Sequence, residues 1–168
     1  PAFDSMANYS LPFQSLYQTF VSRGFAQTQK GYREIGFREV QDLYASLPYL
    51  VNVGKNHLAK ELLGNWIKNV YKMGYANHNF FFVGKEPGMC SDDQIWLIRA
   101  ISEYIQLTGD ISFLNESFPM ADGGTRKLWD TLKAITTYSG RISVGKHLLP
   151  LLDKADWNDC LRIDNDFL

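Results

Sequence analysis

The chain has 168 residues, of which 45% are hydrophobic and 14% aromatic, enough for one buried core and one domain. The 17 basic and 18 acidic side chains leave a net charge of −1, which gives no electrostatic reason to expect nucleic acid or an acidic membrane surface as a partner. No run of 18 apolar residues is present, so no membrane span is predicted.

The cysteines predict the cellular compartment of the protein, and the ends of the chain predict that it is a fragment. Cys90 and Cys160 match no metal-binding spacing, which favours a reduced, cytoplasmic protein without a metal. The chain starts at Pro1, without an initiator methionine or a signal peptide, and stops at Leu168 without an obvious closing element. We therefore expect residues 1–168 to be a fragment of one domain of a longer chain.

Apolar residues recur at helical spacing in five segments. In chain order, these segments cover residues 13–21, 37–47, 58–71, 95–105 and 128–135. Pro48 is expected to end or kink the second helix, and Gly74 and Gly140 to stop the third and fifth. The fourth helix is expected to end near Thr108-Gly109-Asp110. Residues 75–91 and 145–159 are predicted to be irregular connections, with a strand only around residues 80–83. The fold class is therefore all-α, and the long loops should gather at one end, where a site can form.

Two adjacent acids, Asp92 and Asp93, stand immediately before the fourth helical segment. One of them can cap the helix N-terminus while the other favours its dipole, which is a purely structural role. Alternatively, one caps the helix and its neighbour faces a cleft as a general acid, because paired carboxylates can raise one pKa.

Residues 31–42 combine arginine, acids and glycine at the start of the second helix. Arg38 and Asp42 are four residues apart and share a helical face, where a surface salt bridge would contribute only about 0.3–0.5 kcal/mol. Alternatively, they hold sugar hydroxyls, with Arg23 or Arg33 available for an anion.

Residues 154–159 pack acids, an amide and an indole into a short segment. Carboxylates and amides can hydrogen-bond hydroxyl groups, and an aromatic ring can stack on a sugar face, so these residues fit a sugar-binding site. A turn around a buried tryptophan would explain the same residues without a ligand. The isolated His78 and His147 form no zinc motif, and neither a phosphate-binding glycine loop nor an esterase serine motif occurs.

Taken in order, these segments resemble glycoside hydrolase family 94, the inverting phosphorylases. The matching motifs lie at residues 8–14 (N-x-x-L-P-Y-Q in the family), 36–42 (G-F-R-D-x-x-Q-D), 91–97 (S-D-D-x-L-W-L), 104–119 (Y-x-x-x-T-G-D-x-x-x-L-x-E-x-x-P), 147–151 (H-G-L-P-L) and 156–159 (D-W-N-D). Glu39 replaces an aspartate, the arginine-to-glutamine spacing is one residue shorter, Leu148 replaces a glycine, and Lys154-Ala155 replaces a glycine pair. These departures favour a divergent branch, which we expect to resemble the 1,2-β-oligoglucan phosphorylases.

The resemblance implies a fold, a reaction and a set of partners. The chain would supply about half of an (α/α)6 barrel. The reaction would be reversible, inverting phosphorolysis of a β-glucosidic bond in a β-glucan oligosaccharide or a disaccharide, which yields α-glucose 1-phosphate. Phosphate would be a co-substrate, and no metal or organic cofactor would be needed. The full-length protein would form a homodimer and bind neither nucleic acid nor a membrane.

The resemblance also implies site residues. The general acid would be Asp92 or Asp93, with Asp92 preferred. The sugar would be bound by Arg38, Gln41, Asp42, Asp156, Trp157 and Asp159. Phosphate would be bound by Arg23, with Arg33 as the second candidate. Two rival readings remain: an inverting hydrolase on the same scaffold, which would need a second carboxylate to activate water, and a helical carbohydrate-binding module without catalysis.

Overall fold

The computed structural model describes residues 2–12, 40–77, 79–81, 84–86 and 90–152. In chain order, its elements are α1 (Ala2–Ser5), the π-helix η1 (Met6–Ser10), α3 (Val40–Asn52), α4 (Asn56–Ile67), β1 (Asn79–Phe81), β2 (Gly84–Glu86), α5 (Asp93–Thr108), the 3-10 helix η3 (Ile111–Asn115), β3 (Ser117–Pro119), β4 (Thr125–Lys127), α6 (Leu128–Thr137) and the π-helix η4 (Tyr138–Ile142). The described part is therefore mainly helical, as predicted.

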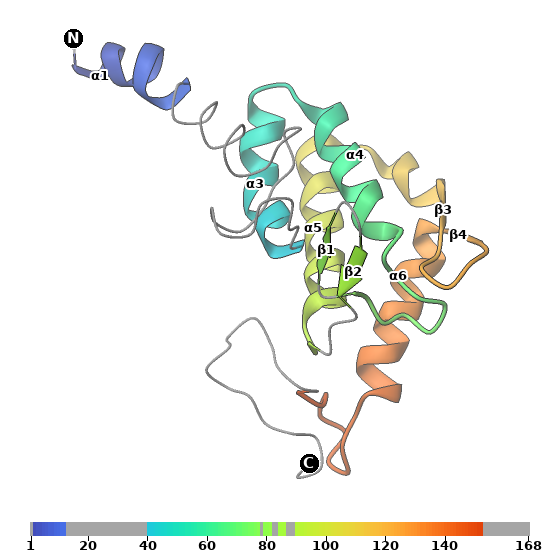
Figure 1. Ribbon diagram of the computed structural model, residues 1–168. Helices are drawn as coiled ribbons and strands as arrows, with labels where there is room; N and C mark the ends of the chain where they lie inside the picture. Colours follow the sequence, from blue (N-terminus) through green and yellow to red (C-terminus); the bar gives the residue numbers. More distant parts are fainter. Residues whose placement is uncertain (1, 13–39, 78, 82–83, 87–89, 153–168) are drawn as a thin grey trace.

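Helices α3, α4 and α5 pack together around the core. α3 and α5 run in the same direction and pack directly against each other, and α4 runs antiparallel to both (Figure 1). The largest fully buried aliphatic side chains on these helices are Leu43, Leu47, Leu63, Ile67, Leu97 and Ile101. Each such side chain contributes about 1.5–3 kcal/mol by leaving water, so this shared core fixes how the three helices align.

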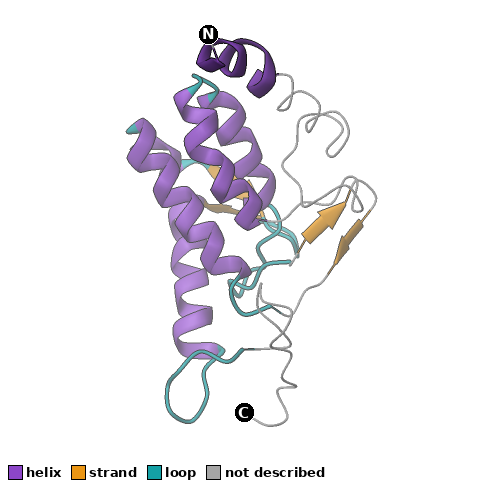
Figure 2. Cartoon of the chain, turned by 90° about the vertical axis from the view of Figure 1, so that its left-hand side faces the viewer, coloured by secondary structure: helices purple, strands orange, loops and turns teal. Residues whose placement is uncertain are grey.

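Two short antiparallel hairpins lie beside the helices (Figure 2). β1 pairs with β2, with Phe80 opposite Lys85, and β3 pairs with β4, with Phe118 opposite Arg126. The strand predicted around residues 80–83 overlaps β1, whereas β2, β3, β4 and η3 were not predicted from the sequence. Three-residue strands are too short to show a reliable alternation of polar and apolar residues.

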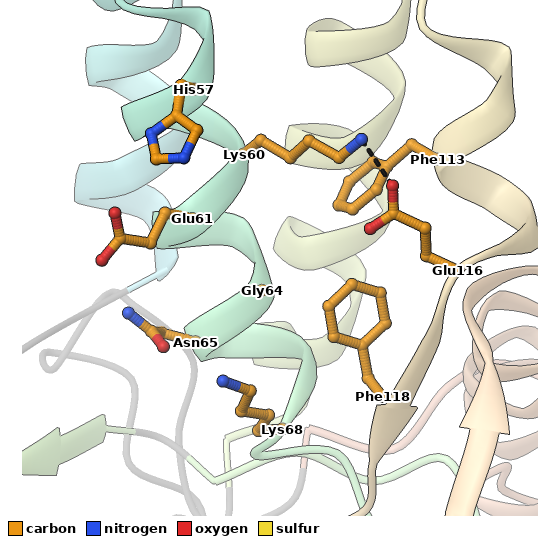
Figure 3. A pocket seen from close by; sticks show the side chains of 9 residues that line it. All are labelled: His57, Lys60, Glu61, Gly64, Asn65, Lys68, Phe113, Glu116 and Phe118. Atoms are coloured by element: carbon orange, nitrogen blue, oxygen red, sulfur yellow. Dashed lines mark ion pairs between the residues drawn. The ribbon is translucent and has the colours of Figure 1, made fainter.

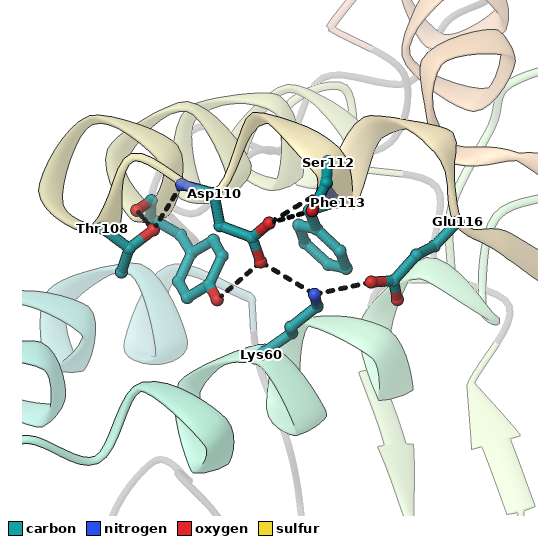
Figure 4. Close-up of polar contacts among 7 residues, drawn as sticks. Lys60, Thr108, Asp110, Ser112, Phe113 and Glu116 are labelled. Carbon is teal, nitrogen blue, oxygen red and sulfur yellow. Dashed lines mark hydrogen bonds and ion pairs between the residues drawn. The ribbon is translucent and has the colours of Figure 1, made fainter.

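The C-terminus of α5 is held to α4 by a polar cluster (Figure 4). Gly109 adopts the left-handed conformation that ends α5, as predicted, and Asp110 then caps η3 by accepting a hydrogen bond from the Phe113 amide. Nζ of Lys60 lies 2.8 Å from Oδ2 of Asp110 and 2.5 Å from Oε1 of Glu116. Chiefly because of the Lys60 hydrogen bond, the pKa of Asp110 falls to about 2.

Pro48 neither ends nor breaks the second helix, because α3 continues through it to Asn52. A proline inside a helix costs about 3 kcal/mol through a lost hydrogen bond and a clash. That cost is offset by burial on both sides of the proline, since Leu47 is fully buried and Leu50 and Val51 pack partly against the core.

The third helix is shorter than predicted, because α4 ends at Ile67 rather than near Gly74. Nδ2 of Asn69 donates a 2.8 Å hydrogen bond to the Asn65 carbonyl, and Val70 then forms a β-bridge with Ala76. The apolar residues between the end of α4 and residue 71 are therefore spaced for burial and do not continue the helix. Gly74 instead closes a tight turn, with φ of 102°.

The fifth helix also ends earlier than predicted, since α6 stops at Thr137 and Gly140 lies inside η4. The segment expected at residues 13–21 lies outside the described residues, as does the start of the second segment, at residues 37–39. No helix within the described ranges is both long and apolar enough to cross a lipid bilayer.

Candidate active site

The N-termini of α3 and α5 lie at the same end of the helical core. The ring of Tyr44, in the second turn of α3, lies 5.6 Å from that of Trp96, near the start of α5. Because the two helices run in the same direction, the contact brings Gln41 and Asp42 to the end of the core that also carries Asp92 (Figure 1). Gln41 and Asp42 are both half-buried.

Asp92 occupies the N-cap position of α5 but does not use its side chain as a cap. Its backbone carbonyl accepts hydrogen bonds of 2.9 Å from the amides of Ile95 and Trp96. Within the described first turn of α5 its carboxylate makes no capping bond, and Oδ2 instead accepts a 2.8 Å bond from Nε1 of Trp96. The indole therefore holds this carboxyl group in one orientation.

Asp93 is the first residue of α5 and is only 6% exposed. Its place in the first turn also fits the structural alternative, in which one of the two acids favours the helix dipole. A buried carboxyl group needs polar partners, and a helix N-terminus supplies a favourable partial charge of about +0.5 for it.

Gln94 links the start of α5 to a segment far along the chain. It is 1% exposed, and its Nε2 donates hydrogen bonds to the Ser91 carbonyl at 2.8 Å and to Oγ of Ser139 at 3.2 Å. The bond to Ser139 ties the turn that carries both acids to η4, so Gln94 fixes two segments at this end of the molecule.

The loop after α4 carries a second polar network. Asn77 is fully buried; its Nδ2 donates to Oδ1 of Asn69 at 3.4 Å, and its Oδ1 accepts from the Tyr71 hydroxyl at 3.0 Å. The ring of Tyr75 lies 5.6 Å from that of Tyr138 in η4. The Asn77 bonds hold the loop together, the Tyr75 ring holds it against η4, and η4 in turn contacts Gln94.

The structure thus brings Gln41 and Asp42 to the same end as Asp92 and Asp93. The other predicted site residues lie outside the described residues: Arg23, Arg33, Arg38, Asp156, Trp157 and Asp159. Sequence reasoning missed the contacts made by Trp96 and Gln94. The four-residue spacing of Asp92 and Trp96 on one helix could have revealed the first, whereas no local signal links Gln94 to Ser139, 45 residues away.

The fold and this site define a helical domain that carries acidic side chains at the N-terminal ends of two parallel helices. Residues 1–166 match the model of the glycosyl hydrolase 94 superfamily, catalytic domain. The chain therefore belongs to this family, as its sequence motifs indicated.

Three relatives illustrate the similarity. The chain is 31% identical to solabiose phosphorylase of Paenibacillus borealis over 135 residues, which are 80% of this chain and 16% of that protein. It is 40% identical to N,N'-diacetylchitobiose phosphorylase of Vibrio proteolyticus over 44% of this chain and 9% of that protein. It is 26% identical to the cyclic beta-(1,2)-glucan synthase NdvB of Rhizobium meliloti over 94% of this chain and 6% of that protein. The chain thus spans less than a fifth of the length of each of these relatives.

Proposed function

We propose that the intact protein containing this chain is an inverting glycoside phosphorylase that cleaves a β-glucosidic bond in a disaccharide or short β-glucan. The family and the phosphorylase names of two relatives support the reaction class. The observation that carries the proposal at the level of residues is the acid pair at the start of α5, with Asp93 buried and Asp92 held by Trp96.

In the proposed reaction, a phosphate oxygen attacks the anomeric carbon while the bond from that carbon to the leaving oxygen breaks. One carboxylic acid donates its proton to that leaving oxygen, and the products are α-glucose 1-phosphate and a shortened sugar. Phosphate is already an anionic nucleophile at neutral pH, so no carboxylate is needed to activate it. An inverting hydrolase needs such a second carboxylate for water.

Asp92 is the preferred proton donor, because a general acid must be aimed at the leaving oxygen and the indole of Trp96 fixes its carboxyl group. Asp93 would then orient the sugar from its buried position. Gln41 and Asp42 would bind the glucosyl unit together with Arg38, and Asp156, Trp157 and Asp159 would line the sugar cleft. Arg23, or otherwise Arg33, would bind phosphate, assisted by the two helix N-termini, which favour an anion.

The architecture belongs to the same proposal. α3 and α5 run in the same direction with α4 antiparallel to both, which is the arrangement expected for part of an (α/α)6 barrel (Figure 1). A complete barrel, a homodimer and a cytoplasmic location stay predictions, as does the relationship to 1,2-β-oligoglucan phosphorylases.

Separate Asp92→Asn and Asp93→Asn variants of the intact protein test the proton donor. Each is assayed for phosphate release from α-glucose 1-phosphate plus an acceptor, and for phosphorolysis of a disaccharide and of a dinitrophenyl β-glucoside. The dinitrophenolate leaves without protonation, so loss of the true acid should abolish disaccharide cleavage but largely spare the activated glycoside. If both variants keep normal turnover of the disaccharide, neither residue is the acid.

Omitting phosphate from the assay tests the reaction class. A phosphorylase should then release no glucose, whereas the rival hydrolase would release it at an undiminished rate. Binding of the glucan without turnover in either condition would favour the carbohydrate-binding module instead.

A further inference from the structure

A pocket of about 300 Å³ lies between α4 and the segment that runs from η3 into β3 (Figure 3). It is lined from α4 by His57, Lys60, Glu61, Gly64, Asn65 and Lys68, and from the other side by Phe113, Glu116 and Phe118. This volume is at the lower end of the range of about 300–1,000 Å³ that small-molecule sites occupy, so it suits a ligand of one or two rings.

The pocket is separate from the candidate active site. Its Lys60 pairs with Asp110, which follows the C-terminus of α5 (Figure 4), whereas Asp92 and Asp93 lie at the N-terminus of that helix. The 16 residues of α5 rise about 1.5 Å each, so the two ends lie roughly 24 Å apart.

The charges that line the pocket cancel. Two lysines face two glutamates, and Nζ of Lys60 is already paired with Asp110 and Glu116. The ion pairs outweigh the desolvation that would lower the pKa of Lys60, and its pKa is raised. A lysine that is held in this way has little capacity to attract a further anion, so the lining favours a neutral ligand.

Hydrogen-bonding groups of several kinds and an aromatic ring line the pocket. The α4 side contributes the Asn65 amide, the exposed Glu61 carboxylate and the exposed Lys68 ammonium, and the opposite side contributes the half-buried ring of Phe118 (Figure 3). Carboxylates, amides and ammonium groups all bond hydroxyls, and the negative face of an aromatic ring attracts the slightly positive C–H face of a sugar.

Because Gly64 has no side chain, the Phe118 ring has room to lie against α4. A Cβ at this position would lie 3.2 Å from Cε1 of Phe118, closer than most side-chain contacts. The ring also makes an edge-to-face contact with Phe113, at a centroid distance of 5.8 Å and an interplanar angle of 90°. The ring is therefore held against α4 before any ligand arrives.

From these observations we infer that the pocket is a second saccharide site, which takes one or two neutral sugar units and is distinct from the catalytic centre. Such a site would hold an oligosaccharide to the protein without taking part in bond cleavage. The inference does not depend on which aspartate is the proton donor.

The test is carried out on the intact protein, with the β-linked glucose disaccharides sophorose and cellobiose as probes. Binding is measured by titration calorimetry, and the ligand is located in soaked crystals. The double variant Glu61→Ala/Lys68→Ala removes one acid and one base from the pocket. The matched control Asp130→Ala/Lys133→Ala removes an exposed acid and base from α6, where they form an i,i+3 ion pair.

We expect calorimetry to show two classes of binding site. The weaker class should lose about tenfold in affinity in the pocket variant and stay unchanged in the control. The soaked crystals should show sugar density beside Phe118. The kcat/KM for a disaccharide should be the same in both variants. A third variant, Gly64→Ala, should weaken the same class by displacing the ring, with folding checked by thermal unfolding.

A single class of site in the intact protein, or equal weak-site affinity in the pocket variant and its control, would overturn the inference. Asp92→Asn and Asp93→Asn should keep the weak class whatever their turnover, so a failure of the proposed mechanism can be told apart from a failure of this site.

Discussion

Nε1 of Trp96 donates a 2.8 Å hydrogen bond to Oδ2 of Asp92, one turn earlier on the same helix. The indole is itself packed against the ring of Tyr44 on α3. The orientation of Asp92 therefore depends on the packing of two helices, and this dependence can be measured in the intact protein.

Trp96→Phe should lower kcat by about 10- to 100-fold with little change in KM, because a misaimed acid slows proton transfer but leaves sugar binding intact. Steady-state phosphorolysis provides the measurement. The control is Trp129→Phe, on α6, where the side chain is 53% exposed and a normal kcat is expected. A normal kcat in Trp96→Phe would show that the indole does not position the acid.

Lys60→Met should reduce the stability that Asp110 contributes. The folded pKa of Asp110, about 2, lies below its ordinary value of 3.8, so this contribution is present above pH 4 and is lost as the pH falls toward 2. Removing Lys60 eliminates the main cause of the lowered pKa. We expect a loss of about 1 kcal/mol at pH 7, since both side chains are partly exposed, and a weaker pH dependence between pH 4 and 2.

Unfolding of the intact protein at several pH values measures the effect of Lys60→Met. Lys133→Met is the matched control, because it breaks an ion pair with Asp130 whose side chains are 59% and 46% exposed. Equal losses in the two variants would mean that the cluster at Asp110 adds nothing beyond an ordinary surface pair.

Gly74→Ala should destabilise the protein by about 3 kcal/mol or more. Gly74 has φ of 102°, and a Cβ there would lie 2.1 Å from the Ala134 carbonyl oxygen on α6. Gly109→Ala is the control, since Gly109 has φ of 73° but no described atom within 4 Å of the added Cβ, and only the backbone cost of about 1 kcal/mol is expected. Thermal unfolding compares them, and equal losses would exclude the clash with α6.

Arg126→Lys should loosen the loop between α4 and β1. The Arg126 guanidinium donates to the Lys72 carbonyl at 2.7 Å, the Tyr71 carbonyl at 3.2 Å and Oγ1 of Thr131 at 3.1 Å. A lysine cannot reproduce this planar fork, so a loss of about 1–3 kcal/mol is expected. Hydrogen exchange at the amides of Gly74 and Asn77, both hydrogen-bonded in this loop, should become faster. The exposed Arg141→Lys change should leave these amides unaffected.

Features that depend on neighbouring residues could be predicted from the sequence. The apolar spacing from Ile95 to Ile105 and the glycine at position 109 predicted α5, and the adjacent acids before it predicted where its N-terminus lies. The ordered motifs along the chain predicted the family, which the match over residues 1–166 confirms.

Features that depend on distant segments could not be predicted in this way and are seen only in the folded chain. α3 continues through Pro48 because core contacts on both sides offset the lost hydrogen bond, and α4 stops at Ile67 because the chain turns back to pair Val70 with Ala76. Gln94 meets Ser139 across 45 residues, and the pocket combines α4 with Phe118. Periodicity reports that a side chain is buried but not which segment buries it, so these pairings required the folded chain.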